Sequence, residues 1–345
     1  MKSLLCLVAA AVLGLAFQRL GIPHGLLLGA ILASALIAGK LGHSPALPFG
    51  LGYVQVVLGI ATGLMFESWD NQTVAAVLPS LGLLLIALVL QISAAAVWLL
   101  KVAKWNRTDS LIAVYPGALA AVFDLLESEG ASAKVIVVHL VRLLSITVLV
   151  SFYIPPSQAA PVVTAIAPAA LGYLWPVCLL VGLCLLIGRL LLRIGVPAPF
   201  MLTAIVVTGV FMKTGYLHGF QMPEWSIDSA ALILGVLIGS KFSDITLRDL
   251  VRHGRTGVAC VTLMLLIAAV FAEAAKLALG NDPVVTWLAY MPGAIETIAM
   301  VAFGGGLNVV FILCHHLVRL LILHFAPALL VQARRWRHSA ERPPL

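Results

Sequence analysis

Apolar runs long enough to cross a membrane follow one another along almost the whole chain. A transmembrane α-helix needs about 17 to 25 mostly apolar residues, and runs of that length recur from the N-terminus to beyond residue 320. Hydrophobic residues make up 62% of the 345 residues and charged residues only 10%. A single globular core cannot bury that much apolar surface. The sequence therefore predicts an all-helical, polytopic membrane protein surrounded by the lipid bilayer.

An internal duplication organises these apolar runs. Residues 115–144 read YPGALAAVFDLLESEGASAKVIVVHLVRLL, and residues 291–321 read MPGAIETIAMVAFGGGLNVVFILCHHLVRLL. Both segments begin at a Pro-Gly pair, break at glycine and end in His-Leu-Val-Arg within an apolar run. We therefore expect a first membrane repeat, a second membrane repeat and a basic cytoplasmic tail, at residues 1–160, 161–333 and 334–345.

Each repeat is expected to contain five spanning helices and one re-entrant Pro-Gly segment. The expected helices lie at 3–20, 23–39, 51–66, 75–101 and 134–154, and at 170–193, 197–213, 227–241, 256–278 and 307–332, with the Pro-Gly segments at about 110–128 and 286–304. An odd number of crossings would invert one repeat relative to the other.

Charge in the connecting loops favours this inverted arrangement. Lys101 and Lys104 follow the fourth helix of the first repeat, whereas Arg248 and Arg252 precede the fourth helix of the second. Because basic loops stay in the cytoplasm, matching helices would run in opposite directions. Both termini would then be cytoplasmic. The alternative, twelve crossings in two parallel repeats, places one basic cluster outside.

Two arginines are expected to lie deep in the membrane. Arg142 and Arg319 close the two copies of His-Leu-Val-Arg, and His139 and His316 precede them by three residues on the same helix face. A buried charge in lipid is costly and usually faces a cavity or a partner, so we predict that the arginines bind substrate. Each histidine could bind substrate, relay a proton or satisfy a backbone carbonyl.

The Pro-Gly pairs are predicted to break helices inside the membrane. Irregular backbone survives there only when it is buried in protein or lines a watery cavity, so Pro116-Gly117 and Pro292-Gly293 are candidate substrate-binding positions. The alternative is an ordinary proline kink. Glu296, three residues beyond Gly293, and Asn308, which follows a glycine run, are candidates for coupling a proton or a sodium ion.

Other functional classes find little support in the sequence. The five cysteines lie in apolar segments without C-x-x-C spacing, and hydrolase or metalloenzyme motifs such as G-x-S-x-G and H-E-x-x-H are missing. The formal charge of +7 is carried by short clusters between apolar runs, not by a surface for nucleic acid. We therefore expect no catalytic residues, no metal and no cofactor.

The paired Pro-Gly and His-Leu-Val-Arg motifs resemble those of the AbrB family of bacterial membrane proteins, over nearly the whole chain. The resemblance implies an inner-membrane protein with a duplicated domain, related in fold to transporters with inverted repeats. The family typically carries Pro-Gly-Gly and a nearby glutamate in both copies. Here Ala118 and Ala294 follow the Pro-Gly pairs, and Ala120 stands where the second copy has Glu296.

These features favour a secondary transporter of a small organic anion, possessing a midplane site between the repeats and coupling to protons or sodium. One alternative is a membrane-embedded sensor that regulates gene expression through a partner, as the regulatory family name suggests. A copper oxygenase, suggested by another label of the family, would need a histidine cluster. The small residues of the third and fourth helices would also suit a homodimer.

Overall fold

A computed structural model describes residues 2–41, 47–65, 71–115, 133–154, 156–157, 173–217 and 219–323. All regular elements in these ranges are helices. The first half of the chain forms α1 (Lys2–Arg19), α2 (Gly25–Leu41), α3 (Gly50–Leu64), α4 (Asn71–Lys101), α5 (Arg107–Val114) and α7 (Ala133–Tyr153). The second half forms α8 (Leu174–Arg193), α9 (Pro199–Lys213), α10 (Glu224–Ser240), the 3₁₀ turn η3 (Lys241–Asp244), α11 (Leu247–Leu279), α12 (Pro283–Tyr290) and α13 (Ile295–Gly304), followed by a helix over Val309–Leu323.

The prediction of an all-helical, polytopic membrane protein is confirmed. Within the described ranges, five segments are long and apolar enough to cross a bilayer: Val77–Lys101, Ala133–Tyr153, Trp175–Arg193, Glu224–Ser243 and Leu247–Leu279. Several of them also expose large apolar side chains, such as Val89 on α4, Leu186 on α8 and Val270 on α11. Contiguous apolar surface of this kind is unfavourable in water and suits contact with lipid.

The helix bounds differ from the prediction chiefly where charged residues flank an apolar run. The helix expected at 256–278 begins at Leu247, so Arg248 and Arg252 lie in its first turns and not in a loop before it. The Thr246 side chain accepts a hydrogen bond from the backbone N–H of Asp249 and so caps the helix, and arginine is itself a good helix former. Hydropathy marks only the apolar part of this helix, which begins at Leu247.

Most of the first Pro-Gly segment and the whole basic tail fall outside the described residues. The inverted orientation and the domain division therefore stay predictions.

Glycines allow two pairs of helices to pack closely in matching ways. A Cβ at Gly59 of α3 would lie 2.6 Å from Ala204 of α9, and one at Gly235 of α10 would lie 2.6 Å from Ala30 of α2. A second glycine four residues later, Gly63 or Gly239, makes the next contact in each pair. Small residues at this spacing let helix backbones approach in a membrane.

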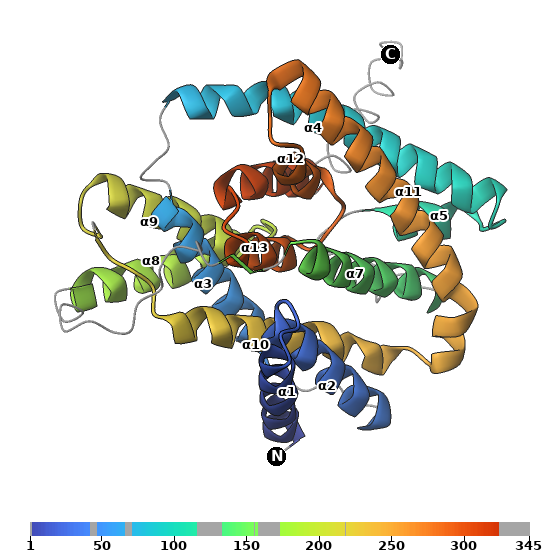
Figure 1. Cartoon of the computed structure of the whole chain (residues 1–345), viewed down its shortest axis with the longest axis horizontal. Coiled ribbons are helices and arrows are strands. Elements are labelled where there is room, and N and C mark those ends of the chain that lie inside the picture. The colour runs from blue at the N-terminus through green and yellow to red at the C-terminus, as the bar shows by residue number, and fades with distance from the viewer. Residues whose placement is uncertain are drawn as a thin grey trace, which may run out of the picture.

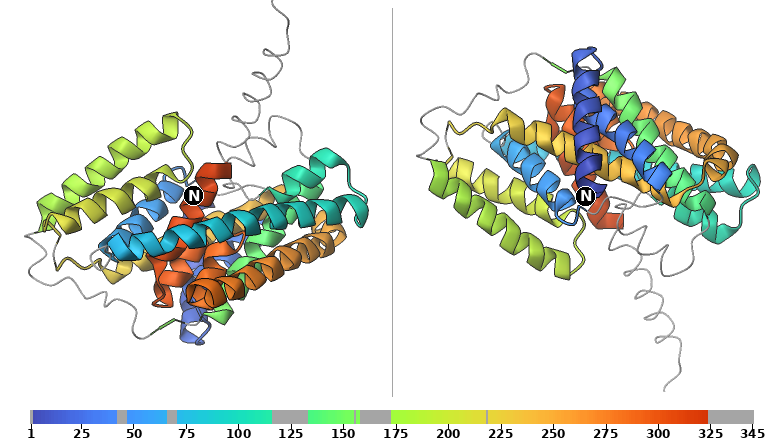
Figure 2. Two further views of the ribbon diagram at one scale, coloured as in Figure 1. Left: turned by 90° about the horizontal axis from the view of Figure 1, so that it is seen from above. Right: turned by 90° about the horizontal axis from the view of Figure 1, so that it is seen from below.

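Helix α13 lies at the centre of the molecule, between α3 and α7 (Figure 1). Helices α2, α3, α9 and α10 pack together on one side of it, joined by α1 and α8. Helices α4, α5, α7, α11 and α12 pack together on the other. Figure 2 shows α8 and α9 at the opposite end of the molecule from α5 and α11. Contacts of α13 with both groups place its residues between them.

Candidate functional site at the helix breaks

The second Pro-Gly pair separates two short helices inside this apolar protein. Helix α12 ends at Tyr290, and Met291 and Ala294 are both extended before α13 begins. The last carbonyl groups of a helix have no partner within it, and lipid supplies none. Pro292 adds no N–H donor to help. The break therefore needs hydrogen-bond donors from elsewhere in the protein.

His316 and Arg319 supply these donors. His316 Nε2 donates to the carbonyl of Leu288 at 2.8 Å, so its Nδ1 is the acceptor and receives a hydrogen bond from Arg319 Nη2 at 2.7 Å. Arg319 also donates to the carbonyls of Met291, at 2.5 Å, and Gly293, at 3.1 Å. The pair thus caps the broken end of α12. The histidine makes the bond to a backbone carbonyl that was one of its three expected roles.

The first repeat has the same arrangement where it is described. His139 Nε2 lies 3.0 Å from the carbonyl of Ile112, and Arg142 Nη2 lies 3.0 Å from His139 Nδ1. Arg142 Nη1 makes a longer contact of 3.4 Å with the carbonyl of Tyr115. Ile112 and Tyr115 stand 176 residues before Leu288 and Met291. Pro116 and Gly117 lie outside the described residues.

The two guanidinium groups create positive charge in the interior. Arg142 is 7% exposed and Arg319 1% exposed, so both are buried. Neither arginine forms an ion pair with a carboxylate within the described ranges. Arg319 Nε is buried there without a hydrogen-bond partner. A buried guanidinium group that keeps an N–H donor of this kind could bind an anion.

Glu296 lies in the first turn of α13 and bonds to the neighbouring helix α3. Gln55 Nε2 donates to Glu296 Oε1 at 2.9 Å. Among the described residues, Glu296 makes no ion pair with Arg142 or Arg319. Asn308, the other predicted coupling residue, accepts a hydrogen bond from the backbone N–H of Phe311 at 3.1 Å and so caps the next helix.

A polar cluster beside the break was missed by the sequence reasoning. His315 Nε2 lies 2.9 Å from Ser80 Oγ, and the Tyr290 hydroxyl donates to the Ser80 carbonyl at 2.7 Å. Gln91 Nε2 donates to the Tyr290 carbonyl at 3.1 Å. These side chains are almost fully buried. Ser80 and Gln91 come from α4, and no local motif links them to a break some 200 residues away.

Replacing Tyr290 with phenylalanine is expected to lower stability by about 1 kcal/mol. The change removes the hydroxyl that bonds to Ser80, and an intramolecular hydrogen bond contributes about 0.5–1.5 kcal/mol. Thermal unfolding of the purified protein in detergent would measure it. Tyr216→Phe, at an exposed tyrosine, is the control and should change little. Equal effects of the two substitutions would contradict a specific role for the cluster.

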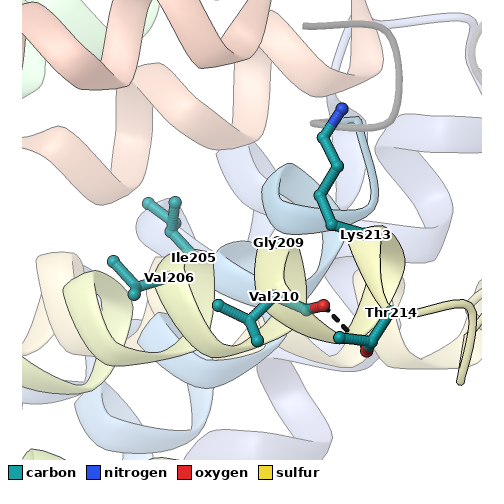
Figure 3. A pocket seen from close by; sticks show the side chains of 6 residues that line it. All are labelled: Ile205, Val206, Gly209, Val210, Lys213 and Thr214. Atoms are coloured by element: carbon teal, nitrogen blue, oxygen red, sulfur yellow. Dashed lines mark hydrogen bonds between the residues drawn. The ribbon is translucent and has the colours of Figure 1, made fainter.

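An open groove of about 360 Å³ lies on α9 (Figure 3). It is lined by Ile205, Val206, Gly209, Val210, Lys213 and Thr214. The hydroxyl of Thr214 donates a hydrogen bond to the carbonyl of Val210 at 2.9 Å. The groove contains none of the predicted substrate residues and is a feature of the helix surface. No group of three or more His, Cys, Asp or Glu side chains suited to a metal ion occurs in the described part of the chain.

Comparison with known proteins is consistent with the resemblance in the motifs. Residues 42–335 match the model of a family described as transition state regulatory protein AbrB. An Escherichia coli (strain K12) protein, named as a candidate regulator AbrB, is 25% identical over 337 residues, which cover 94% of each chain. No solved structure gives a significant match.

Proposed function

The chain belongs to the AbrB family, and from this premise we propose that it is a secondary transporter of a small organic anion. The observation that carries the proposal is the pair of buried arginines at the C-terminal ends of α5 and α12, without a carboxylate partner in the described ranges. Capping uses the two Nη atoms of Arg319 and, within the described part of the chain, leaves its buried Nε without a hydrogen-bond partner. An anion bound there would accept a hydrogen bond from this N–H and balance the buried positive charge.

The ends of the broken helices support the same function. Ala294 caps α13 without a side-chain hydrogen bond, so the N–H groups of its first turn point out of the helix end. Gly293, whose carbonyl bonds to Arg319, directly precedes this end. Half-helices that meet within the membrane bind substrates in many transporters with repeats. The anion would thus be held by arginine and by backbone N–H groups.

Alternating access would follow from movement of one helix group against the other. Helices α2, α3, α9 and α10 pack through close glycine contacts, which favour a rigid unit. The breaks belong to the group containing α7, α11 and α12. Inverted repeats, if the chain has them, would give two equivalent states that open to opposite sides.

Transport can be tested with the purified protein in proteoliposomes. Acetate, lactate, succinate and benzoate would be supplied under imposed pH and sodium gradients, with transient currents and exchange of labelled anion as readouts. Arg142→Gln is expected to weaken the apparent affinity about 10- to 100-fold, because a bond to a charged group contributes about 1.5–3 kcal/mol. Arg189→Gln, at an exposed arginine of α8, is the matched control and should behave as wild type.

A regulatory role is the second candidate, favoured by the names of the matched family and of the Escherichia coli relative. A membrane sensor would bind the anion at the same breaks but would move none across the bilayer. Binding by calorimetry without flux, together with a partner that copurifies on the cytoplasmic side, would support the sensor and contradict the transporter. Flux that Arg142→Gln leaves unchanged would contradict the proposed site.

A further inference from the structure

A carboxyl group and a carboxamide meet at the contact between the two helix groups. Glu296 is the second residue of α13, and Gln55 lies within α3, where it is 4% exposed. Their hydrogen bond of 2.9 Å joins residues 241 positions apart in sequence. The corresponding positions of the other repeat, Ala120 and Ala231, are alanines. The pair is therefore a feature of one break only.

This pairing suits a group that gains and loses a proton. An ionised carboxylate only accepts hydrogen bonds, and the Gln55 amide offers it an N–H. A protonated carboxyl group has an O–H to donate, and the same amide, turned by 180° about its last torsion, offers its oxygen. Both protonation states are thus satisfied without moving α3 or α13. An arginine or lysine partner would favour only the ionised state.

We infer that Gln55 and Glu296 form a proton-binding site and, on the basis of the proposed function, that the proton bound there accompanies the anion. Ionised Glu296 occupies the same helix end that would hold an anion and repels it. A proton from water, taken up on a carboxylate oxygen of Glu296, removes that repulsion.

Other ionisable groups lie on the elements packed against α13. They are Tyr53 on α3, Lys134, His139, Arg142 and Tyr153 on α7, Glu224 and Asp228 on α10, and Cys314, His315, His316 and Arg319 on the helix that follows. The contacts described above tie His139 and His316 to backbone carbonyls and Arg319 to the end of α12. Among the described residues, Gln55 is the side chain with a hydrogen bond to the Glu296 carboxyl group.

Infrared difference spectroscopy can test the proton site without any anion. The purified protein would be titrated from neutral to acidic pH, and the C=O stretch of a protonated carboxyl group in an apolar site would be followed. That band should grow as the pH falls and should vanish in Glu296→Gln. Glu273→Gln, at an exposed carboxylate of α11 that pairs with Lys276, is the control and should retain it. A band that survives Glu296→Gln would overturn the assignment.

The role of Gln55 has its own test in the same titration. Gln55→Leu removes the donor to the ionised carboxylate, so the midpoint should move up by about one pH unit, the equivalent of one charge-assisted hydrogen bond. Gln55→Glu places two carboxyl groups together, and because their negative charges repel, the titration midpoint should move further up. An unchanged midpoint in both variants would show that Gln55 only fills space.

Coupling to transport is read separately. In the proteoliposomes described above, wild-type uptake should rise as the external pH falls, and Glu296→Gln should lose this pH dependence. A pH dependence equal to that of wild type in the variant would contradict coupling through Glu296. Because the infrared titration contains no anion, its result stands whether or not the protein transports one, so failure of the proton site and failure of the transporter proposal can be told apart.

Discussion

Replacing Arg319 with alanine is expected to destabilise the protein by about 3 kcal/mol or more, and by clearly more than Arg142→Ala. Arg319 bonds to the carbonyls of Met291 and Gly293 and to His316. The substitution leaves these three acceptors without a donor in an apolar interior, where an unsatisfied buried group costs about 1–3 kcal/mol. Arg142 makes one comparable bond, to His139, and one long contact among the described residues.

Thermal unfolding in detergent, followed by circular dichroism, would compare the two variants. Arg319→Lys keeps the positive charge but loses the planar, forked donor set, so it should fall between wild type and Arg319→Ala. A stable Arg319→Ala that loses only anion binding would show that the bonds to α12 contribute little. The order of stability of the three variants therefore shows whether Arg319 stabilises the end of α12 or serves only to bind substrate.

The sequence was informative about the breaks because their chemistry is local. Proline and glycine mark the irregular backbone, and arginine in an apolar helix marks a polar partner. The spacing of His316 and Arg319 also predicts one shared helix face, which the structure confirms through their mutual hydrogen bond. The spacing could not show which groups the two side chains bind. Their partners are the backbone carbonyls of Leu288 and Met291, and every residue has such a carbonyl, so no residue type in the sequence marks them.

Long-range partners were beyond the reach of sequence patterns. Gln55, Ser80 and Gln91 are single polar residues in apolar helices, and each meets the second break through tertiary packing. Short helices α5 and α12 were also missed, because eight residues are too few to give a clear apolar period. A rule could have found these polar residues: a buried polar side chain in a membrane needs a partner.

The duplicated motifs and the glycine contacts are related by the same separation in sequence. Gly59 and Gly235 stand 176 residues apart, the same separation as Ile112 and Leu288 at the breaks. A shared separation in helix packing and in hydrogen bonding indicates that the repeated sequence produces repeated local structure. Differences between the copies, such as Glu296 against Ala120, are then positions where we expect the two halves to differ in function.

Replacing Gly239 with alanine is expected to destabilise the packing of α10 on α2 by about 1–3 kcal/mol. The new Cβ would lie 2.4 Å from the carbonyl oxygen of Ile31 and 2.8 Å from Cβ of Ser34. The first of these is backbone, so the helices must separate to relieve the clash, at the usual cost of overpacking. Gly63→Ala should behave alike, since its Cβ would lie 2.5 Å from Cβ of Thr208 on α9.

Gly182→Ala on α8 provides the matched control and should shift stability in the opposite direction. Among the described residues, no atom outside the local backbone of α8 lies within 4 Å of its Cβ position. Alanine in a helix interior is favoured over glycine by about 1 kcal/mol, so this variant should unfold at a slightly higher temperature. Opposite shifts for the same chemical change can arise only from the neighbouring helix. Similar shifts for Gly182→Ala and Gly239→Ala would mean that α10 and α2 do not approach as closely as the glycine contacts require.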